Sequence, residues 1–284
     1  MEIWQAIVLG LVQGLTEFLP VSSSGHLTLV QNLMGLDLGG IDLLFDIILH
    51  VGTLVAVCAV FWRDIIDLFK KPFKTLLYLI VATIPAGIVG VLLMDWSDEV
   101  INGSQYIGIL LAVFFTLTAI LLLVTEIYAK RRNKEKELPL CWRTTISMGC
   151  AQAVAALFPG LSRSGTTICA GVLAGGRSDE LSKFSFLMSI PVILGSFAVS
   201  LLKGAMDGEL VSSFTTIGPN AGWCIAIGFI VAAVSGLFAI KVMLGAIRKA
   251  NYKWFSLYLV LLAIACIVLY CTCLLYTSDA ADEL

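Results

Sequence analysis

Two short segments of this chain collect side chains that phosphate chemistry uses. The first begins at Gln13 and reads QGLTEFLPVSSSGH, and the second ends at Gly165 and reads FPGLSRSG. In the first segment, Gln13 and Glu17 are four residues apart and therefore share one face of a helix. In the second segment, Arg163 supplies a fixed cation whose planar fork suits phosphate. A carboxylate, an arginine and several hydroxyl groups brought together predict a pocket that binds phosphate groups.

Both segments also predict a helix that starts at a run of serines. Serine is a favourable N-cap, and the free N–H groups at a helix start bind anions. We therefore expect the phosphate groups to be bound by Ser22, Ser24, Gly25, Ser162, Ser164, Gly165 and Thr166. For each serine taken singly, a simple cap is the more common role.

Ser23 and His26 are the candidates for the reaction itself. Ser23 is the candidate nucleophile, and His26 is the only nearby imidazole that could act as its base or as the acid for the leaving group. Glu17 and Arg163 complete the expected catalytic set, because Glu17 can hold a cation and Arg163 can neutralise charge on the phosphoryl group. Direct attack by His26 or by water is an alternative that the sequence leaves open.

Simpler roles exist for two pairs of charged side chains. Glu17 and Arg163 could form a buried salt bridge without chemistry. A carboxylate in so apolar a segment is costly, however, and is by default a functional candidate. His50 follows Asp46 by four residues, and a structural hydrogen bond between them explains this spacing at least as well as catalysis does.

The elements that position these residues are expected to be membrane helices. Hydrophobic residues make up 59% of the chain, charged residues make up 13%, and the mean hydropathy is +0.96. Uncharged runs close to the ~20 residues that cross a bilayer are Ile47–Trp62, which is the shortest, Thr75–Met94, Tyr106–Thr125, Phe184–Leu202, Ala221–Ile240 and Trp254–Leu275. The expected fold is an all-α polytopic membrane protein with six transmembrane helices. Because the start has no basic region and carries Glu2, we expect no cleavable signal.

The two polar segments are copies of each other at a spacing of 139 residues. This shift places Gly10 on Gly149, Gln13 on Gln152, Pro20 on Pro159, Ser23 on Ser162, Thr28 on Thr167 and Phe45 on Phe184. A duplicated, interrupted apolar segment is typical of a site built near the middle of a membrane by two broken helices. We therefore predict two re-entrant helical hairpins in an inverted-topology repeat.

Charged residues give the expected orientation. Basic residues gather at 63–74, 130–143, 177–183 and 241–253, whereas residues 95–99 and 203–209 are acidic or mixed. The positive-inside rule assigns the basic groups to the cytoplasm. The hairpins at 1–40 and 144–176 would then enter from opposite faces, each followed by three spans. Ordinary kinked spans are the alternative.

This threading predicts a single membrane domain over residues 1–275. Repeat 1 covers residues 1–128, a cytoplasmic loop covers 129–143, and repeat 2 covers 144–275. Residues 276–284 form a small, acidic tail that is either a flexible outer segment or appended sequence.

The two motifs resemble the signatures of a known family. QGLTEFLPVSSSGH and FPGLSRSG look like the two motifs of the undecaprenyl-pyrophosphate phosphatases, the bacitracin-resistance membrane family of bacteria, and the resemblance runs from residue 1 to about 272. It implies removal of the terminal phosphate of undecaprenyl pyrophosphate, which recycles the lipid carrier of cell-wall precursors. It also implies a divalent cation, Mg²⁺ or Ca²⁺, held by Glu17 and by the amide oxygen of Gln13. The site would open to the outer, periplasmic face of the cytoplasmic membrane.

Partners and rival functions follow from the same features. The expected partners are the polyprenyl pyrophosphate and membrane lipids, with no nucleic acid, and a homodimer is left open. An inverted-repeat transporter or lipid flippase would use similar broken helices. A phosphatidic-acid-phosphatase type site would need a nucleophilic histidine after its Ser-Arg motif, and this chain has no histidine after His50.

Overall fold

Helices account for nearly all of the chain that the structure describes. The computed structural model describes residues 1–36, 41–97, 100, 104, 106–132, 137–206, 221–248 and 252–282. Parts of the charged loops used for the orientation, such as residues 98–99, 133–136 and 207–220, lie outside the described residues. Within the described ranges the only β pairing is one isolated bridge between Leu138 and Gly176. The all-α prediction is confirmed.

Five helices are long and apolar enough to cross a membrane: α5 (Lys74–Leu92), α7 (Ile107–Arg131), α10 (Ser178–Met206), α12 (Ala221–Arg248) and α13 (Lys253–Asp282). A sixth span is obtained if α3 (Ile41–Val60) and α4 (Trp62–Leu68), which meet at 80°, count as one broken span. A short helix, α6 (Met94–Ser97), precedes α7. The chain is therefore an integral membrane protein with five to six spans. Helix α13 continues past Leu275, so the described part of the acidic tail is helical.

Two pairs of shorter helices carry the motifs. The first pair is α1 (Ile3–Phe18) and α2 (Ser23–Leu33), and the second is α8 (Trp142–Leu157) and α9 (Arg163–Leu173). Each pair is interrupted at a proline. A proline forces the residue before it into extended backbone, and both C-caps obey this: Leu19 has ψ 148° and Phe158 has ψ 106°. Both predicted breaks are confirmed.

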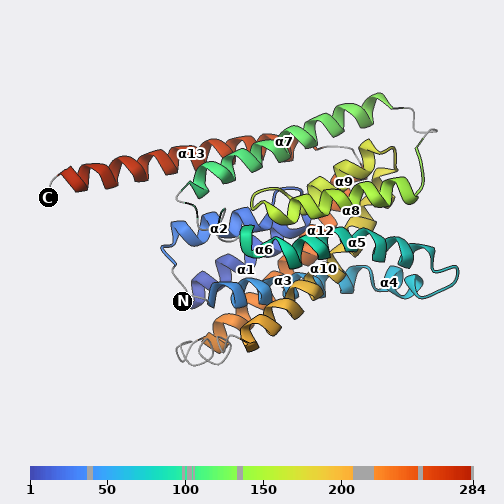
Figure 1. Ribbon diagram of the computed structural model, residues 1–284, viewed down its shortest axis with the longest axis horizontal. Coiled ribbons are helices and arrows are strands. Elements are labelled where there is room, and N and C mark those ends of the chain that lie inside the picture. The colour runs from blue at the N-terminus through green and yellow to red at the C-terminus, as the bar shows by residue number, and fades with distance from the viewer. Residues whose placement is uncertain are drawn as a thin grey trace.

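The two halves of the chain use the same helix pairings. Helix α1 packs against α12, and α8 packs against α5, while α12 also contacts α3 and α10 contacts α5. Glycines permit the close approach, since a Cβ added at Gly10 would lie 2.7 Å from the Gly228 carbonyl oxygen, and one at Gly149 would lie 2.8 Å from that of Ala82. Helices α7 and α13 run side by side, and α4 lies at the opposite end of the molecule from the N-terminus (Figure 1).

Candidate functional site

The loops after the two prolines touch each other inside the helix bundle. The Ser164 hydroxyl donates to the backbone oxygen of Leu19 at 2.9 Å. A Cβ added at Gly25 would lie 2.8 Å from the Cα of Gly160, and one at Gly165 would lie 3.1 Å from the Cβ of Pro20. These contacts bring the N-terminal ends of α2 and α9 together, and no larger residue than glycine fits at Gly25.

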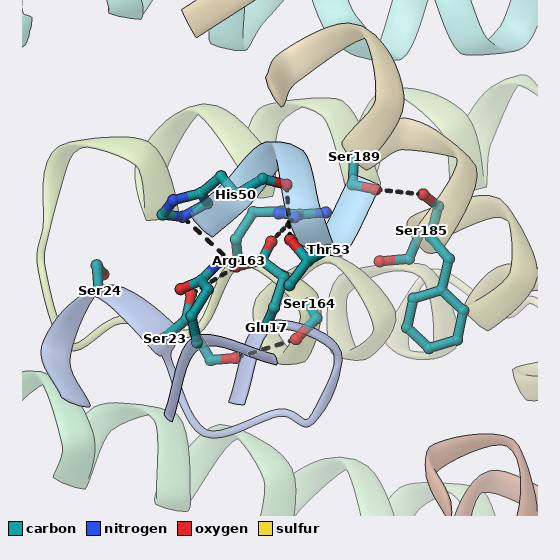
Figure 2. A network of polar contacts seen from close by, with 12 residues as sticks. Glu17, Ser23, Ser24, His50, Thr53, Arg163, Ser164, Ser185 and Ser189 are labelled. Carbon is teal, nitrogen blue, oxygen red and sulfur yellow. Dashed lines mark hydrogen bonds and ion pairs between the residues drawn. The ribbon is translucent and has the colours of Figure 1, made fainter. Parts of the chain in front are cut away.

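The Glu17 carboxylate is the centre of a polar network at this contact. Its Oε2 accepts hydrogen bonds from the Ser23 hydroxyl at 2.6 Å and from Gln13 Nε2 at 3.1 Å. Its Oε1 accepts from Arg163 Nη2, and His50 Nε2 lies 3.6 Å from Oε2. Figure 2 shows Ser23, His50 and Arg163 converging on Glu17. The structure thus brings together four site residues expected from the sequence, which are Gln13, Glu17, Ser23 and Arg163. It also contains the Glu17–Arg163 ion pair.

A serine caps each of the helices α2 and α9, which is the common role of a single serine at a helix start. The Ser22 hydroxyl accepts from the Gly25 backbone N–H at 3.4 Å, and the Ser162 hydroxyl accepts from that of Gly165 at 3.1 Å. These equivalent caps lie 140 residues apart, one more than the shift that aligns the motifs, because the second loop has one more residue between its proline and its cap. The alignment of Ser23 on Ser162 is therefore wrong at the level of structure.

The corrected register makes Ser23 and Arg163 structural equivalents. Each is the first residue of its helix, directly after the capping serine. Each also reaches the same carboxylate, Ser23 through Oε2 of Glu17 and Arg163 through Oε1. The duplication therefore presents a hydroxyl and a guanidinium to Glu17 from two opposed helix starts, where N–H groups favour negative charge.

Several buried polar atoms of the two interrupted helix pairs have no hydrogen-bond partner in the described part of the protein. They are Arg163 Nη1, Gln13 Oε1, Thr166 Oγ1 and both amide atoms of Gln152. A buried polar group without a partner costs roughly 1–3 kcal/mol. Arg163 Nη1 is a donor and suits a phosphate oxygen, whereas Gln13 Oε1 is an acceptor and suits a cation. Arg163 in particular donates to Glu17 from Nη2, whereas its buried Nη1 has no hydrogen-bond partner among the described residues.

Access to the network is limited to a few side chains. Ser24 is exposed, and Ser23 is partly exposed. The His50 and Arg163 side chains are 29% and 17% exposed, whereas the Glu17 side chain is only 5% exposed. The other residues expected to bind phosphate are buried, and they are Ser22, Gly25, Ser162, Ser164, Gly165 and Thr166. A ligand therefore reaches Glu17 past Ser23, Ser24, His50 and Arg163.

His26 does not join the Glu17 network. Its Nδ1 lies 2.6 Å from the backbone oxygen of Ser22, and its Nε2 lies 2.7 Å from the Tyr258 hydroxyl. The ring is buried against Phe115 and Tyr258. Both ring nitrogens thus have partners other than Ser23, which His26 was expected to activate.

His50, whose role the sequence left open, lies beside the Glu17 carboxylate. Its Nδ1 bonds the backbone oxygen of Asp46 at 2.7 Å, which turns Nε2 toward Glu17. The Asp46 carboxylate instead accepts from Gln31 Nε2 at 2.9 Å. The spacing of Asp46 and His50 indicated a local contact, but no pattern in the sequence shows which face of α3 turns toward Glu17.

The donor set limits what a metal could use. No group of three or more His, Cys, Asp or Glu side chains suited to a metal exists among the described residues. Glu17 and Gln13 are the pair expected to hold a cation, and Gln13 Oε1 is a buried oxygen without a partner. These two side chains fit a cation that takes most of its ligands from phosphate and water, as Mg²⁺ commonly does.

Comparisons with known proteins cover almost the whole chain. The family described as bacitracin resistance protein BacA matches residues 6–265. A protein of Halothermothrix orenii named undecaprenyl-diphosphatase is 40% identical over 273 residues, which are 95% of this chain and 98% of that protein. Proteins with the same name from Methanobrevibacter smithii and Bacteroides fragilis are 39% and 37% identical, covering 91% and 94% of this chain and 94% and 98% of their own lengths.

Proposed function

This chain belongs to the bacitracin resistance protein BacA family, and we propose that it is an undecaprenyl-diphosphatase whose reaction takes place at Glu17. It hydrolyses undecaprenyl pyrophosphate to undecaprenyl phosphate and phosphate, which returns the lipid carrier to cell-wall synthesis. The single observation that carries the site assignment is the arrangement around one buried carboxylate. Glu17 accepts hydrogen bonds from the Ser23 hydroxyl and from Arg163 Nη2, and Arg163 Nη1 has no partner in the described protein.

Substrate binding follows from the charges and the helix starts. The pyrophosphate would lie between the N-terminal ends of α2 and α9, where Arg163 Nη1 and the helix N–H groups stabilise its negative charge. The polyprenyl chain would stay among the lipids and the apolar helices. This arrangement places the terminal phosphorus next to Ser23, the partly exposed hydroxyl of the network.

The hydrogen bond from Ser23 to Glu17 supports Glu17 as the base. In the first step, the Ser23 oxygen attacks the terminal phosphorus and its proton passes to Glu17 Oε2, 2.6 Å away. The bond between that phosphorus and the bridging oxygen breaks, and undecaprenyl phosphate leaves with the electron pair. In the second step, water attacks the phosphoserine, the Glu17 proton returns to Ser23, and the protons of water leave with the phosphate. This assignment replaces His26 as the base.

A divalent cation, Mg²⁺ or Ca²⁺, is part of the proposal. Glu17 and Gln13 would hold it, since Gln13 Oε1 is an oxygen ligand without a protein partner. When bound, it would neutralise part of the pyrophosphate charge. Chelation should therefore lower the rate of phosphate release, and Mg²⁺ or Ca²⁺ should restore it.

We also propose that the chain is an inverted-topology repeat of two re-entrant hairpins and six spans. The pairing of α1 with α12 and of α8 with α5, together with the direct contact of the two proline loops, supports this arrangement. The site would open to the periplasmic face of the bacterial cytoplasmic membrane. A homodimer remains a prediction, which mass measurement in lipid nanodiscs tests.

Phosphate release from undecaprenyl pyrophosphate by the purified protein tests the function. The native chain should release phosphate in detergent, and Glu17→Ala should abolish release while leaving expression unchanged. Gln13→Ala should have a milder effect, because Gln13 donates only one of the hydrogen bonds to Glu17. If the native chain binds the lipid without releasing phosphate, the transporter or flippase alternative replaces the hydrolase.

A further inference from the structure

Ser22 has a backbone conformation that serine seldom adopts, directly before the proposed nucleophile. Its φ is 70° and its ψ is 100°. A residue other than glycine in such a region costs roughly 1–3 kcal/mol and persists only where the surrounding structure holds it. The second loop avoids this cost, because its cap Ser162 has φ −64° and its positive φ of 92° falls on Gly160. Contacts specific to the first loop must therefore hold Ser22.

His26 provides one of these contacts. The backbone oxygen of Ser22 accepts from the backbone N–H of His26 at 3.3 Å and lies 2.6 Å from His26 Nδ1. A carbonyl oxygen can only accept, so Nδ1 carries a proton. In the neutral ring, Nε2 is then an acceptor, and it lies 2.7 Å from the Tyr258 hydroxyl, which can donate to it.

Tyr258 reaches His26 from the other half of the chain. It lies on α13, and its ring is almost parallel to the imidazole, with an interplanar angle of 9° and a centroid distance of 5.7 Å. Phe115 on α7 packs against the imidazole at 5.4 Å. The orientation of His26 is therefore fixed by stacking on Tyr258, by an edge-on contact with Phe115 and by hydrogen bonds at both nitrogens.

We propose that Tyr258 is a positioning residue of this site, acting through His26. The Ser22 carbonyl sets the His26 tautomer that donates from Nδ1, and the Tyr258 hydroxyl holds the ring in place by donating to Nε2. The ring thereby holds the Ser22 carbonyl, and Ser22 in turn directs Ser23 toward Glu17. We call this chain of contacts the Tyr258–His26–Ser22 lock. His26 is thereby a positioning residue too, because neither nitrogen is free to accept the Ser23 proton. The inference rests on the proposed function, in which Ser23 is the nucleophile.

Removing one hydroxyl tests the role of Tyr258. Tyr258 is 44% exposed, and Tyr258→Phe keeps its ring, so the substitution leaves the packing of the core unchanged. We expect kcat to fall roughly tenfold, the equivalent of one lost hydrogen bond, while KM for undecaprenyl pyrophosphate stays within about twofold because the phosphate ligands are untouched. Tyr270→Phe is the matched control, since Tyr270 lies on the same helix and packs against Tyr106 instead. A native kcat for Tyr258→Phe overturns the proposal.

Amide substitutions separate positioning from proton transfer at His26. An asparagine amide can place its N–H near the position of Nδ1, whereas a glutamine amide reaches the position of Nε2. The lock predicts that His26→Asn retains at least about a tenth of the native kcat and that His26→Gln loses roughly 10²-fold. A general base would be lost equally in both, because neither amide accepts a proton. Equal loss in both variants therefore overturns the positioning role.

The tautomer itself gives a readout that does not depend on activity. The chain contains only two histidines, so ¹⁵N-histidine labelling of the native protein and of His50→Asn assigns the His26 signals. We expect a protonated Nδ1 and an unprotonated Nε2 in the native chain, and in Tyr258→Phe we expect the Nε2 signal to move to that of an imidazole nitrogen that accepts no hydrogen bond. A native Nε2–H tautomer overturns the lock whatever the activity. Absent phosphate release with the expected spectra rejects the proposed function while keeping the lock.

Discussion

Arg163 lies in the second half of the chain and contacts the catalytic carboxylate proposed in the first half. Its Nη2 donates to Glu17 of the first half, and its Nη1 has no partner in the described protein. One planar guanidinium can therefore hold the carboxylate and a phosphate oxygen at the same time, with both donors fixed relative to each other. A lysine keeps the charge, but its donors all sit on one nitrogen and lack the planar fork that spaces two nitrogens apart.

We expect Arg163→Lys to lose at least ~10²-fold in kcat, which is the scale of removing one strong electrostatic stabiliser from a transition state. Arg163→Ala should lose more. Steady-state phosphate release by both purified variants measures this. A native kcat with only KM raised would show that Arg163 docks the substrate and does not stabilise the transition state.

Ser23 and Ser24 are adjacent hydroxyls with different expected effects. Ser23→Ala removes the proposed nucleophile and should lower kcat by at least ~10³-fold. Ser24 is exposed, and within the described protein its hydroxyl bonds that of Ser22 at 3.4 Å, so Ser24→Ala should mainly raise KM. Trapping labelled phosphate on the native chain, but not on Ser23→Ala, completes the measurement. Labelled phosphoserine formed by Ser23→Ala would exclude Ser23 as the nucleophile.

The residues found by sequence reasoning are those whose chemistry is local to a motif. Gln13, Glu17, Ser23 and Arg163 all lie within the two segments, and apolar surroundings mark each charge as unusual. Tyr258 could not be found in this way, because its role depends on a contact with His26 across 232 positions of the chain. The direction of the His26 ring depends on the same contact, which is why the sequence suggested that it faces Ser23.

At the scale of helices, close packing depends on small residues at the crossing points. Gly149 on α8 faces the backbone of Ala82 on α5, at 2.8 Å from an added Cβ to the carbonyl oxygen, and backbone cannot move aside as a side chain can. The breaks at Pro20 and Pro159 were predictable because proline acts on its own neighbours. The register of the caps was not, since the length of each loop between proline and cap is set by how the two loops pack.

Gly149→Ala should destabilise the protein by about 1–3 kcal/mol through overpacking. Gly87→Ala is the matched control, because Gly87 lies in the middle of α5 with nothing within 4 Å of an added Cβ. Its effect should stay within about 0.5 kcal/mol. Thermal unfolding of both variants in one detergent compares them, and equal midpoints would contradict the packing argument.

At the scale of the molecule, two sites at the predicted opposite faces test the topology. Cys141 is the N-cap of α8 and belongs to the basic group at residues 130–143, which follows α7. Ser104 comes before α7, so the span α7 separates the two positions along the chain. Although burial raises the pKa of the Cys141 thiol, hydrogen bonds from Thr144 and the charge of Arg143 lower it below its usual value, which favours the reactive thiolate. The number of apolar spans was predictable because span length and hydropathy are properties of the sequence alone.

In spheroplasts, an impermeant thiol reagent should label a cysteine at Ser104 but not Cys141, with the other cysteines replaced. Opening the membrane should make Cys141 react as well. Labelling of Cys141 in intact spheroplasts would invert the proposed topology and move the opening of the site to the cytoplasm.

The ion pair between Glu17 and Arg163 also sets an order for biogenesis. While the ribosome is still making the first half, Glu17 has no cation, and a lone carboxylate at the centre of a bilayer costs about 2.5–3.5 kcal/mol on translocon scales. The first hairpin should therefore stay shallow until α9 is synthesised and Arg163 reaches Glu17. Nascent chains arrested before residue 163 should leave a cysteine at Ser23 open to water-soluble reagents, and chains arrested after α10 should protect it. The first hairpin would then reach its final depth in the membrane only after the second hairpin has been synthesised.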